Sequence, residues 1–274
     1  FSAIGNRVKI ITGNKDLFFD CDPIQKLREQ LAIYRCATAH HIPNFVGGAI
    51  GFLAYDAVRL FEDIPCRHAD EDNIPDMFFN FYKSNITFDH QNAKVVISVV
   101  IDSGKEPEIN FKTAENKITG IIKKILSSGV SKNALESPAL AKHGKSEVKI
   151  DLDDRAYADI VEKAKEYIVK GDAFQIVPSR RFQKPFSALP FDIYRALRIC
   201  SPAPYMFFID NRDYVVTGAS PEKFVSLHNN IIESTPIAGT RPRGASYDEH
   251  AMEIDLLQDE KEVAEHMMLV DLFP

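Results

Sequence analysis

Paired cysteines are missing from this sequence. Its four cysteines are widely separated and form no CxxC pair: Cys21, Cys36, Cys66 and Cys200. Structural zinc sites and dense disulfide frameworks depend on closely spaced or numerous cysteines. The spacing therefore argues against both kinds of site, and it favours a reducing compartment, the cytoplasm.

Long apolar runs and an excess of basic residues are also lacking. The longest apolar run, "VGGAIGFLAY" from Val46, is far shorter than the ~20 residues that cross a bilayer. The net charge is −6 and the pI is near 5.8, whereas nucleic acids and anionic membranes select a basic face. We therefore expect no nucleic-acid partner and no membrane partner, so that local groups must hold any bound anion.

Three segments are predicted along the chain. Residues 1–126 alternate strand and helix patterns as an N-terminal α/β part, and residues 127–149 are small and polar, typical of a linker or surface excursion. Residues 150–274 form a second part. No targeting segment is visible. The chain starts inside an expected strand and stops directly after a strong helix, so we expect both ends to be truncated.

Hydrophobic periodicity predicts the regular elements. Strands are expected over 8–13, 94–102 and 173–182, hairpins over 205–219 and 223–237, and helices over 23–34, 115–128, 151–172 and, as one helix or two, 247–272. Hairpin strands flanked by long helices indicate an α+β fold with antiparallel sheets and helices packed outside.

The stretch "ESTPIAGTRPRG", Glu233–Gly244, is unusually rigid and basic for a turn. Gly239 lets backbone amides approach a ligand closely, and Thr240 supplies a hydroxyl donor. Arg241 and Arg243 either hold a carboxylate or shape the loop through ion pairs. The alternative is a decorated hairpin exit without a ligand.

The stretch "DEKEVAEH", 259–266, places acidic residues on one helix face. Glu262 and Glu265 are three residues apart, and His266 follows Glu262 by four. Two carboxylates on one face suit Mg²⁺, with waters and a substrate oxygen completing the shell. The spacing is not HExxH, which excludes a zinc protease. The alternative is a solvated acidic face.

Two single residues are further candidates. Glu222 follows a proline in "GASPEKF", and a partly buried carboxyl on such a turn has the raised pKa that a general acid needs; an exposed turn glutamate is the alternative. Gln175 lies in the strand expected over 173–182, where a buried amide demands partners, unless it faces water on an edge strand.

The glycines of "VGGAIGFLAYD" do not form a nucleotide-binding loop. The pattern is not GxGxxG, and no suitable acidic residue ends a second strand. Close packing of backbone against backbone is the use that these glycines indicate.

Five motifs in order carry a family resemblance: "GDAFQIVPSRRF", "SPAPYMFFID", "GASPEKF", "STPIAGTRPRG" and "DEKEVAEHMMLVDL". Together they resemble the chorismate-utilising enzymes, most closely the large subunits (component I) of anthranilate synthases. The resemblance covers nearly the whole chain except the linker. It implies the αββα sandwich of that family and a lyase of tryptophan biosynthesis, which aminates chorismate and eliminates pyruvate to give anthranilate.

The resemblance also implies roles for residues. Glu265 is then a Mg²⁺ ligand and Glu262 a second acidic group at the metal, which holds the ring carboxylate of chorismate. The loop residues Gly239 and Thr240 contact chorismate. Glu222 resembles the acid that protonates the departing hydroxyl in isochorismate enzymes.

Two positions distinguish members of the family. Enzymes that add water carry a lysine where this chain has Gln175, which cannot act as a base. Aminodeoxychorismate synthases carry lysine in "PIKGT", where this chain has Ala238. Both differences favour anthranilate synthase. Aminodeoxychorismate synthase component I of the folate pathway stays an alternative, with Ala238 against it.

The resemblance implies partners as well. Ammonia would come from a glutamine amidotransferase subunit (component II), and tryptophan would bind as feedback inhibitor at "PYM", Pro204, Tyr205 and Met206. The family continues beyond "LVDL" into "GRND" and a long second half that completes the site. We therefore expect an incomplete fold and no activity from these residues alone. A non-catalytic remnant that binds tryptophan or a partner is another alternative.

Overall fold

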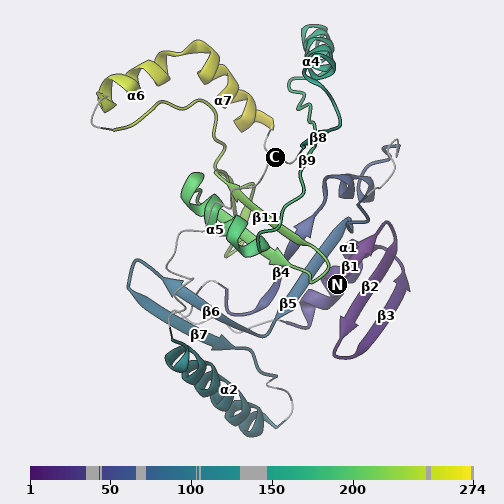
Figure 1. Ribbon diagram of the computed structural model, residues 1–274, viewed down its shortest axis with the longest axis vertical. Coiled ribbons are helices and arrows are strands. Elements are labelled where there is room, and N and C mark those ends of the chain that lie inside the picture. The colour runs from purple at the N-terminus through teal and green to yellow at the C-terminus, as the bar shows by residue number, and fades with distance from the viewer. Residues whose placement is uncertain are drawn as a thin grey trace. The chain divides into compact units, whose positions relative to one another are not determined.

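The computed structural model describes residues 1–34, 43, 45–65, 72–102, 104, 106–129, 147–244 and 248–272. The chain divides into two compact units, Phe1–Ser131 and Lys132–Pro274 (Figure 1). The boundary between them falls within 127–149, the segment predicted to be a linker. Residues 130–146 of that segment lie outside the described residues.

The first unit contains a five-stranded antiparallel sheet with the order β3-β2-β1-β5-β4. Its strands are β1 (Ser2–Ile4), β2 (Arg7–Thr12), β3 (Lys15–Asp20), β4 (Gly48–Leu53) and β5 (Met77–Tyr82). Gly5 and Gly13 have left-handed φ angles of 51° and 59° in the two turns of the β1–β2–β3 meander. Glycine adopts these angles without steric cost, so both turns stay short.

Alternating side chains of this sheet form the core of the first unit. The buried cluster contains Phe1, Ala3, Val8, Ile10 and Met77. Helix α1 (Pro23–Ala32) packs Ile24 and Leu27 against it. The helix begins at Asp22, whose carboxylate accepts hydrogen bonds from two backbone N–H groups of the first turn.

The glycine-rich stretch over 46–55 packs backbone against backbone, as the sequence predicts. A Cβ on Gly51 would overlap the carbonyl group of Phe78 in the neighbouring strand β5, and one on Gly47 would overlap the Val100 side chain. The two segments of the chain approach each other this closely because glycine lacks a Cβ atom. The 3₁₀ helix η1 (Tyr55–Leu60) follows β4.

A hairpin and a long helix complete the first unit. Strands β6 (Ser84–Asp89) and β7 (Lys94–Val99) pair antiparallel, and helix α2 (Pro107–Ser127) contacts β7. The strand and helix predicted over 94–102 and 115–128 correspond to β7 and α2. The strand is shorter than expected, and the helix begins eight residues earlier than expected.

The second unit contains the two predicted hairpins. The first pairs β10 (Tyr205–Asp210) with β11 (Val215–Ser220), and the second pairs β12 (Ser226–His228) with β13 (Ile231–Glu233). The second hairpin turns through Asn229 and Asn230, whose φ angles are 49° and 63°. Asparagine tolerates the left-handed region that a tight hairpin turn requires.

Helix α5 (Pro190–Cys200) contacts both strands of the first hairpin. Phe208 of β10 meets Phe191 edge to face, with ring centroids 5.2 Å apart, and Tyr194 lies beside both rings. The sequence interpretation missed this helix, although a proline at its first position and an apolar stripe were signals for it.

Helix α4 (Asp154–Val169) confirms the helix predicted over 151–172. Asp153 caps its start by accepting a hydrogen bond from the Ala156 N–H, 2.8 Å away. After the helix ends, Gly171 has a left-handed φ of 81°. An acidic cap and a terminal glycine are the signals on which the prediction rested.

The strand predicted over 173–182 is wrong for most of its length. Only β9 (Phe182–Gln183) pairs, with β8 (Lys149–Ile150), and residues 173–181 have no regular structure. Pro178 lies in the middle of this segment and has no N–H to donate to a sheet ladder. Gln175 is therefore not in a strand, and it is exposed.

The C-terminal region forms two helices, α6 (Glu249–Gln258) and α7 (Glu260–Leu272), which agrees with one of the two predicted possibilities. Antiparallel sheets combined with helices confirm the predicted α+β class. Among the described residues of the second unit, Ile209 is the only buried hydrophobic one. Apolar side chains of its helices and hairpins are therefore widely exposed.

Two further observations concern membranes and thiols. None of the helices within the described ranges combines the length and the apolar character needed to cross a bilayer. Cys21 and Cys200 carry free thiols, and the other two cysteines lie outside the described residues.

Candidate active site

The loop over 234–244 connects β13 to α6 and has no regular secondary structure. Its first half is attached to the turn that follows β11. The Ile237 N–H donates to Glu222 Oε1 at 2.8 Å, and Ser234 Oγ donates to the Phe224 carbonyl at 3.0 Å. The carboxylate predicted to be a general acid thus helps to hold the loop predicted to bind substrate. Glu222 is exposed, so the partial burial expected for it is wrong.

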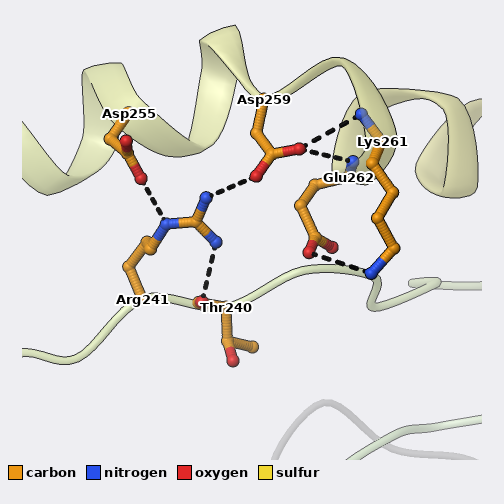
Figure 2. A network of polar contacts seen from close by, with 6 residues as sticks. All are labelled: Thr240, Arg241, Asp255, Asp259, Lys261 and Glu262. Atoms are coloured by element: carbon orange, nitrogen blue, oxygen red, sulfur yellow. Dashed lines mark hydrogen bonds and ion pairs between the residues drawn. The ribbon is translucent and has the colours of Figure 1, made fainter.

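The second half of the loop is attached to helices α6 and α7 through Arg241. Its Nε donates to Asp255 Oδ2 at 2.5 Å, and its NH2 donates to Asp259 Oδ2 at 2.8 Å (Figure 2). The NH1 group donates to the carbonyl of Thr240 at 3.2 Å. Of the two roles that the sequence left open for Arg241, the structure has it in ion pairs that shape the loop.

Asp259 joins the loop to the start of α7. While its Oδ2 binds the guanidinium of Arg241, its Oδ1 accepts the N–H groups of Lys261 and Glu262, both at 3.1 Å. The hydrogen bond from Glu262, followed by the one from Arg241, lowers the pKa of Asp259. Asp255 and then Asp259 raise the pKa of Arg241. Both groups therefore stay ionised around neutral pH.

Glu262 lies directly over Gly239. A Cβ at Gly239 would overlap the Glu262 carboxylate, with Cδ only 2.6 Å away. Gly239 is not among the glycines with a left-handed φ, so its backbone does not require glycine. The lack of a side chain at this position instead makes room for the carboxylate, which is 20% exposed and lies 3.8 Å from Lys261 Nζ.

The predicted metal ligands occupy one face of α7. Glu262 and Glu265 are separated by three residues on this helix, and both are half-buried. Within the described ranges, no group of three or more His, Cys, Asp or Glu side chains could hold a metal ion. These two carboxylates fit the oxygen ligands that Mg²⁺ prefers, and a Mg²⁺ site often has only one or two of them.

The structure places the other loop residues beside this network. Ala238 and Gly239 are half-buried, whereas Thr240 is exposed. Figure 2 shows the Thr240 side chain on the side of the loop that faces away from the two helices. The threonine hydroxyl is thus accessible from outside, while its carbonyl is engaged by Arg241. The structure therefore does not bring the Thr240 hydroxyl together with the carboxylate of Glu262 (Figure 2).

The predicted inhibitor residues lie next to the turn of Glu222. In the β10–β11 hairpin, Tyr205 is paired with Ser220 and Met206 with Ala219. Ser220 Oγ donates to the Glu222 carbonyl at 2.9 Å. Pro204 immediately precedes this hairpin. Gln175 is different, because no hydrogen bond or ion pair joins it to the loop or to α7 among the described residues.

Sequence reasoning did not single out Asp255 and Asp259 as functional residues. The available signal was a pair of aspartates four residues apart, which brings them to one side of the chain if the helix continues. That spacing is common on solvated helices. Asp255 and Asp259 differ from such ordinary surface pairs only because Arg241, 14 and 18 residues earlier in the chain, lies between them in the structure.

Comparisons with known proteins identify the family of the chain. A family model described as chorismate binding enzyme matches residues 2–273. The chain is 37% identical to anthranilate synthase component 1 of Aquifex aeolicus over 262 residues, which is 95% of this chain and 52% of that protein. It is 36% identical to anthranilate synthase component 1 of Acetivibrio thermocellus over 92% of this chain and 51% of that protein.

A solved structure shows the same relation. The crystal structure of anthranilate synthase component I from Streptococcus pneumoniae TIGR4 matches with a TM-score of 0.77 and 33% identity, covering 99% of this chain and 59% of that chain. The chain therefore spans about half the length of the curated relatives that it matches.

Proposed function

The chain belongs to the chorismate-binding enzyme family, and we propose that it forms the chorismate-binding part of an anthranilate synthase component I in tryptophan biosynthesis. The observation that carries this proposal is the loop over 234–244. It is held at one end by Glu222 and at the other by Arg241, and Gly239 lies beneath the carboxylate of Glu262. Relatives named anthranilate synthase component 1 support the assignment.

The proposed reaction converts chorismate and ammonia to anthranilate, pyruvate and water. A C–N bond forms on the ring as the ring hydroxyl leaves with a proton, and pyruvate is then eliminated, which restores aromaticity. The departing hydroxyl needs an acid, and the dianionic substrate needs donors that neutralise its charge. Those two requirements define what the residues of the loop and its neighbours have to supply.

Glu222 is the proposed acid for the departing hydroxyl. One of its carboxyl oxygens, Oε1, accepts the Ile237 N–H, which orients the group and leaves Oε2 to act on the substrate. The same bond joins the acid to the loop that carries the residues proposed to contact chorismate. Holding catalytic and binding groups in fixed relative positions lowers the activation free energy of a reaction substantially.

Gly239 and Thr240 are the proposed contacts to chorismate, with Ala238 beside them. Ala238 has no charge, so we propose that free ammonia is the nucleophile and that no lysine takes part at this position. Gln175 is the proposed reason that water is not activated, since an amide cannot act as a base at neutral pH. These assignments rest on the family resemblance and on the position of the loop.

Glu265 and Glu262 are the residues that would hold Mg²⁺. When bound, the metal offsets the charge of the substrate's ring carboxylate. The two glutamates are three residues apart on one helix face, and the backbone N–H of Glu262 is held by the cap that Asp259 makes at the start of α7. Two carboxylates leave several coordination positions for water and substrate oxygens.

We propose a glutamine amidotransferase subunit, component II, as the source of ammonia, because ammonia is mostly ammonium in neutral water. Tryptophan is the proposed feedback inhibitor, with Pro204, Tyr205 and Met206 forming part of its site beside the turn of Glu222. The expected compartment is the cytoplasm, because the four cysteines form no closely spaced pair and suit a reducing environment.

The test is product identification with the full-length protein that carries these residues. With chorismate, ammonium chloride and MgCl₂, it should release fluorescent anthranilate and pyruvate in equal amounts, and Glu222→Gln should lower kcat by about 10²-fold or more. An aminated product of higher mass, formed without pyruvate, would instead identify an aminodeoxychorismate synthase. Saturable tryptophan binding without any turnover would favour a non-catalytic remnant.

The 274-residue chain by itself should make no anthranilate under the same conditions. Its described residues contain no group of three or more His, Cys, Asp or Glu that could hold a metal ion, so Glu262 and Glu265 would have to hold Mg²⁺ by themselves. The second unit buries a single hydrophobic residue among those described, so its site has little packed support. Detection of anthranilate with the purified 274-residue chain would contradict this part of the proposal.

A further inference from the structure

We propose that Arg241 is a positioning residue, which fixes the substrate-facing loop against the start of the acidic helix α7. The inference rests on the proposed function, because it assigns to Arg241 a role in the same reaction. The evidence for it is separate from the evidence for the proposed function, and it consists of the contacts that the guanidinium group of Arg241 makes.

The guanidinium of Arg241 uses all three of its nitrogen atoms inside the protein. Nε and NH2 bind Asp255 and Asp259, and NH1 binds the carbonyl of Thr240 (Figure 2). A guanidinium that bound a substrate carboxylate would need two neighbouring N–H groups free for a bidentate contact. Three of its five N–H groups are engaged in this way, and the edge formed by Nε and NH2 is taken by the two aspartates. The role in which Arg241 orders the loop is therefore favoured over substrate binding.

The two aspartates lie in different segments, one in a helix and one between two helices, so Arg241 connects three segments. Asp255 belongs to α6, Asp259 connects α6 to α7, and Arg241 itself belongs to the loop. The Arg241 side chain is 21% exposed, against 59% for Asp255 and 33% for Asp259. Fully exposed ion pairs on a protein surface typically contribute little to stability. The Arg241 side chain is more covered than that, so its ion pairs constrain the loop more than exposed pairs would.

Asp259 transmits the attachment to Glu262. One oxygen of Asp259 binds Arg241 and the other binds the Glu262 N–H. On the loop side, Gly239 stands two residues before Arg241 and directly under the Glu262 carboxylate. Release of Arg241 would therefore let Gly239 and Thr240 move away from Glu262, which would separate the two sides of the proposed site.

Lysine cannot reproduce this attachment. Its ammonium is a single point charge, whereas the planar guanidinium presents donors in three directions at fixed angles. A lysine at position 241 could pair with one of the two aspartates but could not also order the Thr240 carbonyl in the same plane. The conservative variant Arg241→Lys therefore tests geometry apart from charge.

The experiment compares variants of the full-length protein in the anthranilate assay and by hydrogen exchange. Arg241→Gln should raise the KM for chorismate and lower kcat/KM by about 10- to 100-fold, since misplacement of binding groups by about 1 Å has effects of this size. Arg241→Lys should recover only a small part of the loss. Hydrogen exchange in 234–244 should become at least severalfold faster in both variants.

The partner aspartates provide a second arm. Asp255→Asn should act in the same direction as Arg241→Gln, and the double variant should be no worse than Arg241→Gln alone, because the two residues act as one unit. Arg155→Gln is the matched control. The side chain of this exposed arginine of α4 has no hydrogen bond or ion pair with another described residue, so its variant should keep kcat/KM within about twofold.

Two results would overturn the inference. The first is a KM that stays within twofold of wild type in Arg241→Gln while kcat falls together with the melting temperature, which indicates only a loss of folded molecules. The second is unchanged hydrogen exchange over 234–244. If the wild-type protein makes no anthranilate, the proposed function fails, and the exchange comparison alone still decides whether Arg241 orders the loop.

Discussion

The replacement Gly239→Ala tests the most specific contact of the proposed site. The new methyl group would lie 2.6 Å from Cδ of Glu262, whereas ordinary van der Waals contact begins at 3.4 Å. The carboxyl carbon therefore has to move by about 0.8 Å if the loop stays in place. Displacements near 1 Å cost catalysis about 10²-fold, so kcat/KM for chorismate should fall by roughly tenfold to a hundredfold.

The same replacement should have little effect on stability. The overlapping atoms are at the end of a flexible side chain, and the φ of Gly239 is not left-handed. An alanine is therefore permitted by the backbone, and the free energy of unfolding should change by no more than about 1 kcal/mol. A loss of activity with retained stability is the expected combination.

The assay is anthranilate fluorescence with the full-length protein, together with urea unfolding followed by circular dichroism. In a Glu262→Asp background the carboxylate is one methylene shorter, so the added methyl should lower kcat/KM by less than about twofold. Gly120→Ala is the matched control, because a Cβ there meets nothing within 4 Å. The reasoning is refuted if Gly239→Ala keeps kcat/KM within twofold of wild type, or if it loses several kcal/mol of stability.

Three further predictions concern the fold. Met77→Ala should lower the free energy of unfolding of the first unit by about 2–5 kcal/mol in urea titrations, since the side chain is fully buried. Asp153→Ala should cost about 1 kcal/mol by removing the α4 cap. Hydrogen bonds from Asn92 lower the pKa of Asp89 below its ordinary value of 3.8. The ionised Asp89 therefore stabilises the folded state above pH 3.8, and this contribution to the free energy of unfolding is lost as the pH falls through the lowered pKa. Asn92→Ala should raise that pKa in a carboxyl NMR titration, and an unchanged value would contradict this assignment.

Elements that depend on neighbouring residues in the chain were predictable. The hairpin turn at Asn229 and Asn230 and the helix between Asp153 and Gly171 follow from residues that satisfy or redirect the backbone locally. The signals for them are contained in windows of a few residues. Gly51 is a partial case. A glycine at this position predicts that another backbone segment packs closely against it, but the sequence does not identify which strand that is.

The segment over 173–182 shows where local signals fail. Its apolar residues resemble a strand, yet a strand exists only where another segment supplies the matching N–H and C=O groups. Lys149 and Ile150 supply them for Phe182 and Gln183 alone. The position of Gln175 therefore could not be settled from its own neighbours.

In the candidate site, too, some features were predictable from the sequence and others were not. Order and spacing along the sequence were enough to select Glu222, Gly239, Thr240, Glu262 and Glu265, because their chemistry and the family resemblance are properties of the chain itself. Only the tertiary structure decided that Arg241 pairs with aspartates 14 and 18 residues away, and that Gly239 is needed to make room for Glu262. A charged group can pair with any opposite charge within reach, and the fold alone determines which one lies there.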